Sequence, residues 1–179
     1  MTTIDLSDPR VAPRRATRRR LPGKMLFLLA FHATLSGAFL VSWLTGDEDT
    51  YGMHRFAGYT VLAALAVRLA VARVAPSGPL RLPRPSAGAA VGWMARLVTG
   101  DARARSQRSP LLAWMAAALL AVVGGAALTG AVADFATPAE RLHEAVADWA
   151  LAVMLAHLAL VFALHALKAR TTRTESPVP

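Results

Sequence analysis

The sequence predicts an all-α integral membrane protein, a bundle of four transmembrane helices with both chain ends in the cytoplasm. The chain has 179 residues, of which 55% are apolar and only 17% are charged, and this composition is too apolar for an ordinary soluble domain. Four apolar runs can each cross a bilayer, since about 20 residues of helix span its hydrocarbon core. The lysines and arginines gather beside alternate ends of these runs.

The net charge of +9 fits a membrane protein better than a nucleic-acid-binding one, because the basic residues fall in short segments beside apolar runs. Seventeen of the 20 lysines and arginines lie in three segments, at 10–24, 73–108 and 168–173. The other two connections hold only Arg55 and Arg141. Positive charge favours the cytoplasmic side, so both chain ends are expected there. The absence of cysteine excludes disulfides, iron–sulfur clusters and thioether-linked haem.

The chain divides into a basic cytoplasmic arm at 1–23, a membrane domain at 24–170 and a polar tail at 171–179. Residues 86–98 are too short for a span and are expected to form an interfacial helix on the inner surface, between the second and third spans. The four spans are expected at about 25–44, 53–74, 110–132 and 138–168.

Local signals mark where the spans begin and end. The acidic residues 47–49 close the first span, and the prolines that follow residue 75 end the second. At the start of the fourth span, Thr137 is the expected N-cap, Pro138 the first helical residue and Glu140 the partner of Thr137 in a capping box.

Histidines inside the spans mark the candidate site, because an ionisable group in a membrane is costly without a partner. His143 and His157 are 14 residues apart, which brings them to within about 40° of one helix face at depths that differ by about 21 Å. His54 sits, like His143, near the outer end of its helix. His32 and His157 lie about 12 and 16 Å from the inner basic boundaries. The histidines therefore form two pairs, His54 with His143 and His32 with His157.

Two histidines at each level suit a haem better than a small metal ion. Zinc would ordinarily need three or four close ligands, including carboxylate or thiolate, and neither level offers a suitable carboxylate deep in the helices. Two axial imidazoles on opposite faces of a porphyrin satisfy such a pair. We therefore expect two non-covalent, bis-histidine haems b. With both axial positions filled, iron is suited to passing single electrons.

Three further residues are candidates near these ligands. Gly58, one turn after His54, lacks a side chain where a macrocycle could press on the helix, although such glycines also serve close helix packing. Arg68, near the inner end of its span, could pair with the propionates of the inner haem or extend to the lipid headgroups. His165 is only three residues from Lys168, too shallow to match His32, and is expected to be an interfacial or quinone-site residue.

Two stretches resemble a known family. HEAVADWALAVMLAH, which begins at His143, is similar to the last helix of the prokaryotic four-helix di-haem cytochromes b, which include bacterial cytochrome b561 and the cytochrome b subunits of nickel–iron hydrogenases. HRFAGYTVLAALAVR, which begins at His54, resembles the family's second helix with its ligand, glycine and arginine. The resemblance covers about 31–165. The chain departs from the family pattern at two places. Ala33 stands where the family often has a tryptophan, and the sequence SQRSP at 106–110 stands where hydrogenase-type relatives commonly show Gly-His-Asn-Pro.

The resemblance implies a carrier in the bacterial cytoplasmic (inner) membrane that exchanges electrons with quinone and with a redox partner. That partner would be a dehydrogenase, a hydrogenase, a soluble cytochrome c or superoxide, and quinone or superoxide oxidoreductase activity is compatible with the role. No nucleic acid is expected to bind. The alternative is a cofactor-free membrane subunit or small transporter that uses its histidines as a proton or metal relay.

Overall fold

The structure, a computed structural model, describes residues 22–75, 78–101, 103–104 and 107–174, with side chains as far as residue 169. The expected arm at 1–23 thus lies almost wholly outside the described residues, as does the end of the expected tail. The regular elements of the described part are helices, and four of them are long and apolar enough to cross a membrane. The predicted all-α class and the four spans are confirmed.

The helices begin and end within a few residues of the expected positions. A short helix is present where the interfacial helix is expected, and its first turn is capped by Ser86, whose Oγ accepts a hydrogen bond from the Ala89 N–H at 3.3 Å. The last helix extends into the expected tail. The long helices are α1 (Gly23–Leu44), α2 (Tyr51–Val74), α5 (Leu111–Ala133) and α6 (Glu140–Thr174), and the short one is α3 (Ala87–Val98).

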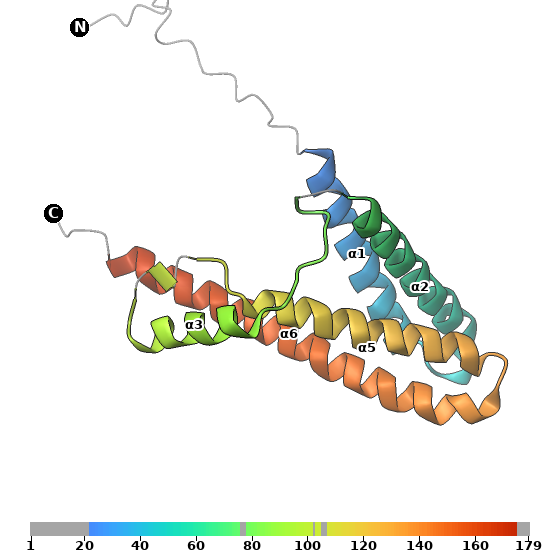
Figure 1. The fold of residues 1–179 in the computed structure, drawn as a ribbon. Helices are drawn as coiled ribbons and strands as arrows, with labels where there is room; N and C mark the ends of the chain where they lie inside the picture. The colour runs from blue at the N-terminus through green and yellow to red at the C-terminus, as the bar shows by residue number, and fades with distance from the viewer. Residues whose placement is uncertain (1–21, 76–77, 102, 105–106, 175–179) are drawn as a thin grey trace, which may run out of the picture.

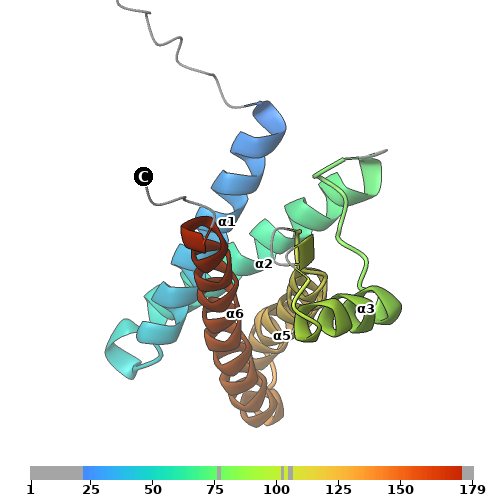
Figure 2. The same ribbon diagram turned by 90° about the vertical axis from the view of Figure 1, so that its left-hand side faces the viewer.

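The four long helices form two antiparallel hairpins. A turn that contains η1 (Glu48–Thr50) joins α1 to α2, and a turn that contains η2 (Thr137–Ala139) joins α5 to α6. The two helices of each hairpin pack together, and the hairpins meet chiefly through α2 and α5. Figures 1 and 2 show the hairpins crossing at an angle, so that they diverge away from their turns. Because the spans alternate in direction, both turns lie at one end of the bundle and α3 lies at the other. The distribution of positive charge predicts that the turns face outward, and the two ends are called outer and inner on that basis.

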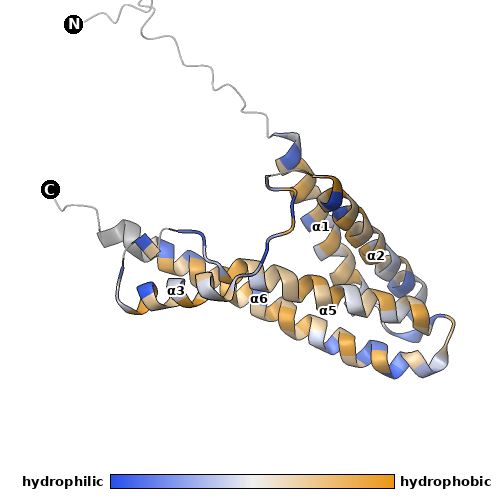
Figure 3. Ribbon diagram, in the orientation of Figure 1, coloured by the Kyte–Doolittle hydropathy of each residue, from blue (hydrophilic) through white to orange (hydrophobic). Residues whose placement is uncertain are grey.

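The core between the hairpins is small, and two of its five buried residues are alanines. Its buried residues are Val61 and Leu65 of α2, Val123 and Ala126 of α5, and Ala150 of α6. Small residues let helix backbones approach closely, which is the main source of packing energy where lipid is as apolar as the side chains. Figure 3 shows hydrophobic residues over most of the four long helices, as a lipid-facing surface requires.

The start of the fourth span differs from the expectation. The capping box is wrong: a 3-10 turn comes first, its N-cap is Ala136, and no side chain of the turn caps it. The backbone satisfies itself instead, since the Ala139 N–H donates to the Ala136 carbonyl at 2.9 Å and the Glu140 N–H donates to the Thr137 carbonyl. Pro138 has no N–H to offer, and this favours the tight turn over a side-chain cap.

Candidate functional site

The two hairpins bring four histidines together as two facing pairs. The ring centroids of His54 on α2 and His143 on α6 are 5.9 Å apart, with an angle of 76° between the ring planes. Those of His32 on α1 and His157 on α6 are 6.4 Å apart, at 64°. Each pair joins one histidine of the first hairpin to one of α6. These are the same partners that helix depth assigns from the sequence.

The spacing of the rings fits a metal atom between them. A metal-bound imidazole nitrogen lies about 2.0–2.1 Å from the metal, so two rings that share one metal atom have centroids roughly 6 Å apart. Both observed separations, 5.9 and 6.4 Å, are close to this value. In the described part of the chain, no group of three or more histidines and carboxylates could hold an ion. Among the described residues, each level therefore offers two imidazoles that face one another.

Backbone carbonyls orient the two outer rings. The Nδ1–H of His54 donates to the Ser42 carbonyl on α1 at 2.7 Å, and the Nδ1–H of His143 donates to the Ala126 carbonyl on α5 at 3.0 Å. A carbonyl only accepts, so the proton of each neutral ring is on Nδ1 and the lone pair is on Nε2. Metal-ligating histidines are commonly held in this way.

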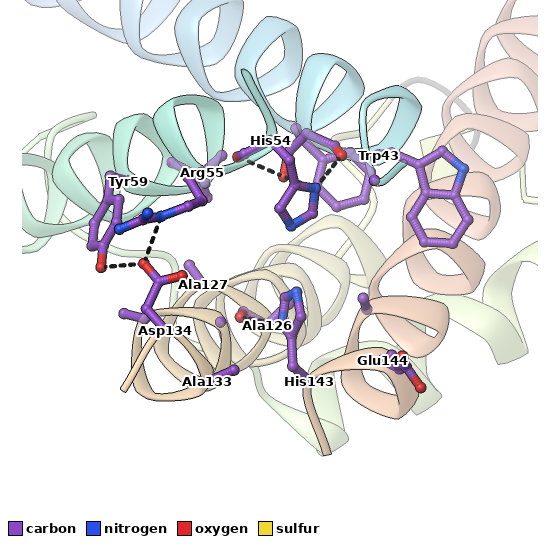
Figure 4. A pocket seen from close by; sticks show the side chains of 18 of the residues that line it. Trp43, His54, Arg55, Tyr59, Ala126, Ala127, Ala133, Asp134, His143 and Glu144 are labelled. Carbon is purple, nitrogen blue, oxygen red and sulfur yellow. Dashed lines mark hydrogen bonds and ion pairs between the residues drawn. The ribbon is translucent and has the colours of Figure 1, made fainter. Parts of the chain in front are cut away.

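A cavity of about 880 Å³ surrounds the outer pair. Figure 4 shows His54 and His143 pointing toward one another across it. Its inner wall includes Val61, Val123 and Ala126, and its rim carries most of the charged side chains of the outer end. Sites for small molecules and cofactors are commonly of about 300–1,000 Å³, mostly apolar with a few placed polar groups, so the cavity suits a large flat ligand.

Two glycines contribute to this cavity. Gly58 lines it as expected, and a Cβ there would lie 3.8 Å from the Ser42 Oγ, an ordinary contact. Gly130 was not singled out from the sequence, yet a Cβ there would lie 2.9 Å from Cε1 and 3.1 Å from Nδ1 of His143. The signal for it was present: the turn between α5 and α6 is centred near residues 136–137, so Gly130 and His143 stand at the same level. The absence of a side chain at Gly130 therefore leaves the space that the His143 ring occupies.

A carboxylate that the sequence reasoning missed joins the hairpins beside the outer pair. Asp134, whose side chain is only 7% exposed, accepts hydrogen bonds from Tyr59 Oη at 2.8 Å, Arg55 Nε at 3.1 Å and Tyr51 Oη at 3.3 Å. The first two are drawn in Figure 4. The Tyr59 hydrogen bond, followed by the charge of Arg55, lowers the pKa of the Asp134 carboxyl. The ring of Tyr51 also stacks on His54, with centroids 6.0 Å apart.

Arg68 is buried, with 6% of its surface exposed. Its Nη1 donates to the Leu80 carbonyl at 2.6 Å and its Nη2 to the Arg81 carbonyl at 3.4 Å, which fastens the segment after α2 to the helix. The guanidinium also lies 5.9 Å from the centre of the Phe31 ring. These contacts use only some of its five N–H groups.

His165 lies apart from both pairs. It lines a smaller cavity of about 190 Å³ at the inner end, between α6, Trp93 and Leu97 of α3, and residues 107–109 and 112. The structure thus brings His157, and not His165, to His32.

A comparison with protein-family models gives a match to the family described as prokaryotic cytochrome b561, over residues 24–174. The match covers most of the chain and includes all four long helices and both histidine pairs. The comparisons with curated proteins and with solved structures return no match.

Replacing Gly130 by alanine should displace the His143 ring, because the new methyl group would lie 2.9 Å from it. The expected cost is that of an overpacked core, about 1–3 kcal/mol, and a lower midpoint of thermal unfolding in detergent would report it. Gly124→Ala is the matched control in the same helix, since its Cβ would meet Leu65 at an ordinary 3.8 Å. Equal midpoints for the two variants would contradict the assignment of Gly130.

Asp134→Asn should destabilise the protein at neutral pH, because it replaces one of the two accepting oxygens by an NH2 group, which cannot accept, and removes the negative charge that is paired with Arg55. The pKa of Asp134 is lowered by folding, so its contribution is complete above the unfolded value and is lost as pH falls through the folded one. The difference in unfolding midpoint between wild type and variant should therefore shrink below about pH 4. Glu140→Gln, which changes an exposed carboxylate of the same cavity, should show a much smaller difference. A wild-type advantage that grew on acidification would contradict this account.

Proposed function

The chain belongs to the prokaryotic cytochrome b561 family of haem b electron-transfer proteins of the membrane, and on this premise we propose that it is a di-haem cytochrome that passes electrons between the quinone pool and a redox partner. The observation that supports the proposal is that four imidazole rings face each other in two pairs, one at each of two levels of the bundle. Bound haem iron would supply reversible one-electron oxidation and reduction.

The outer haem would be held by Nε2 of His54 and of His143. Their Nδ1–H groups donate to backbone carbonyls, which fixes both the tautomer and the orientation of each ring. Gly58 and Gly130 keep the cavity wall free of side chains beside the ligands. Because the protein would fill both axial positions, the site favours electron transfer over the binding of dioxygen or substrate at iron.

The inner haem would be held by His32 and His157, which face each other at 6.4 Å. Arg68 is a buried cation at about the level of this pair. Two of its N–H groups donate to backbone carbonyls, and the other N–H groups could donate to a haem propionate. Residues 24–170 would form the whole cytochrome domain, with the basic arm and tail on the cytoplasmic side of a bacterial inner membrane. Quinone and a dehydrogenase, hydrogenase or cytochrome c are the partners that the family suggests.

The direct test is the haem content of the purified protein. A pyridine haemochrome assay should give about two haems b per chain and low-spin spectra, because both axial positions of each iron would be taken by imidazole. A colourless protein that is otherwise folded would overturn the proposal. It would support instead a subunit or transporter that uses its histidines as a proton or metal relay.

Replacing His54 or His143 by alanine should remove about half of the haem absorbance and leave the other centre intact, since each variant loses one ligand of the outer pair only. Optical and electron paramagnetic resonance (EPR) spectra of the purified variants would measure this loss. Loss of both haems, or of neither, in variants that still fold would contradict the pairing.

His157→Ala should remove the inner haem or convert it to a high-spin form, because His157 is the residue that faces His32. His165→Ala should keep both low-spin spectra and at most slow the reaction with quinone, since His165 lies in a separate cavity. The two variants serve as controls for each other on the same helix. The reverse result would mean that α6 sits about two turns further in than this structure places it.

A further inference from the structure

We infer that the two histidine pairs have surroundings that differ in charge and in hydrogen bonding. As a result, the outer site stabilises oxidised haem iron and the inner site stabilises reduced iron. The outer haem would then have the lower reduction potential. This inference rests on the proposed two-haem function and adds to it an order between the sites. Three observations point in the same direction: hydrogen bonds to the ligands, carboxylates around the outer cavity, and a buried cation at the inner level.

The ligand hydrogen bonds differ between the two levels. Both outer rings donate Nδ1–H to backbone carbonyls, His54 at 2.7 Å and His143 at 3.0 Å. Such bonds make an imidazole a more basic ligand, which favours the higher oxidation state of the metal. At the inner level, Nδ1 of His157 is buried and has no hydrogen-bond partner among the described residues. His157 is therefore expected to be a weaker electron donor than His143, the other histidine of α6.

The charges around the outer cavity act in the same sense. Ferric haem carries one more positive charge than ferrous haem, so a nearby negative charge stabilises the ferric state. Arg55 is the one guanidinium that lines the cavity, and it is paired with Asp134 at 3.1 Å. The other carboxylates are exposed, so each adds a small and partly screened contribution. Five carboxylates line this cavity: Glu48, Asp134, Glu140, Glu144 and Asp148.

The inner level carries the opposite charge. The helices α2 and α6 run in the same direction, and Arg68 follows His54 by 14 residues, as His157 follows His143. Arg68 therefore lies at about the level of His157. It is 6% exposed, and its described hydrogen bonds go to neutral carbonyls. A buried charge is screened less than an exposed one, so Arg68 favours the ferrous state at this level.

The consequence is an order of occupancy between the two sites. In the absence of a membrane potential, a single electron shared by the two centres would reside mainly at the inner one. The three observations arise from separate parts of the chain, so the order does not depend on any one side chain.

The test is a redox titration of the full chain in lipid nanodiscs, where no membrane potential acts, followed by optical and EPR spectra. The wild type should titrate in two steps. The lower-potential step should be missing from His143→Ala and the higher-potential step from His157→Ala. Equal potentials, or the opposite assignment of the steps, would overturn the inference. A wild type with no haem or only one would count against the proposed function itself.

Charge variants decide the question independently of the ligand variants, which can fail to fold. Glu144→Gln removes a negative charge from the outer cavity and should raise only the lower step. Arg68→Gln removes the inner cation and should lower only the higher step, so each variant narrows the gap. Asp49→Asn is the matched control, an exposed carboxylate of the outer turn that does not line the cavity, and should shift the lower step less than Glu144→Gln. Shifts of both charge variants on one and the same step would overturn the inference.

Discussion

The structure depends on one constraint, the need to satisfy an imidazole inside an apolar membrane. A polar ring there costs free energy unless both of its nitrogens have partners. For His54 and His143, one nitrogen is served by a carbonyl of the neighbouring helix, at 2.7 and 3.0 Å. Both bonds reach across the hairpin that carries the ring, so the pairing of α1 with α2 and of α5 with α6 sets where the other nitrogen points.

The second hairpin shows how this constraint shapes its neighbours. The His143 ring needs room on α5, and Gly130 provides it, because any larger residue there would meet the ring. One turn later, the Asp134 N–H donates to the Gly130 carbonyl at 3.2 Å, and its carboxylate draws in Tyr51, Arg55 and Tyr59. The outer end is thus held by polar bonds between the hairpins, whereas the middle of the bundle is held by small apolar residues such as Ala126 and Ala150.

Helix lengths and the histidines that face one another could be predicted from the sequence, because both follow from distances along single helices. An apolar run has a countable length, and the depth of His32 or His157 follows from its separation from a basic boundary. Contacts between helices could not be predicted in this way. Asp134 accepts a hydrogen bond from Tyr59, which is 75 residues away in the sequence, and no local sequence pattern predicts that contact.

The remaining differences have local physical causes. The expected cap at Thr137 was wrong because the backbone turn before Glu140 satisfies its own N–H groups. Arg68 was expected to face a propionate or the headgroups, and the structure adds a third set of partners, the carbonyls of Leu80 and Arg81. Those carbonyls belong to a proline-rich connection whose path is not encoded in any periodicity. Gly130 and His143 are separated from the turn near residues 136–137 by equal numbers of residues, and this count alone would have placed them at the same level.

The helix α6 contributes a histidine to both pairs, and this has a consequence for how the chain can change. One uninterrupted helix sets both the vertical separation of His143 and His157 and the faces they present. Inserting one residue between them would turn His157 by about 100° relative to His143 and add about 1.5 Å. The loops and both chain ends can gain or lose residues without this effect. The 14-residue interval is therefore the part of the chain least able to accept a change in length.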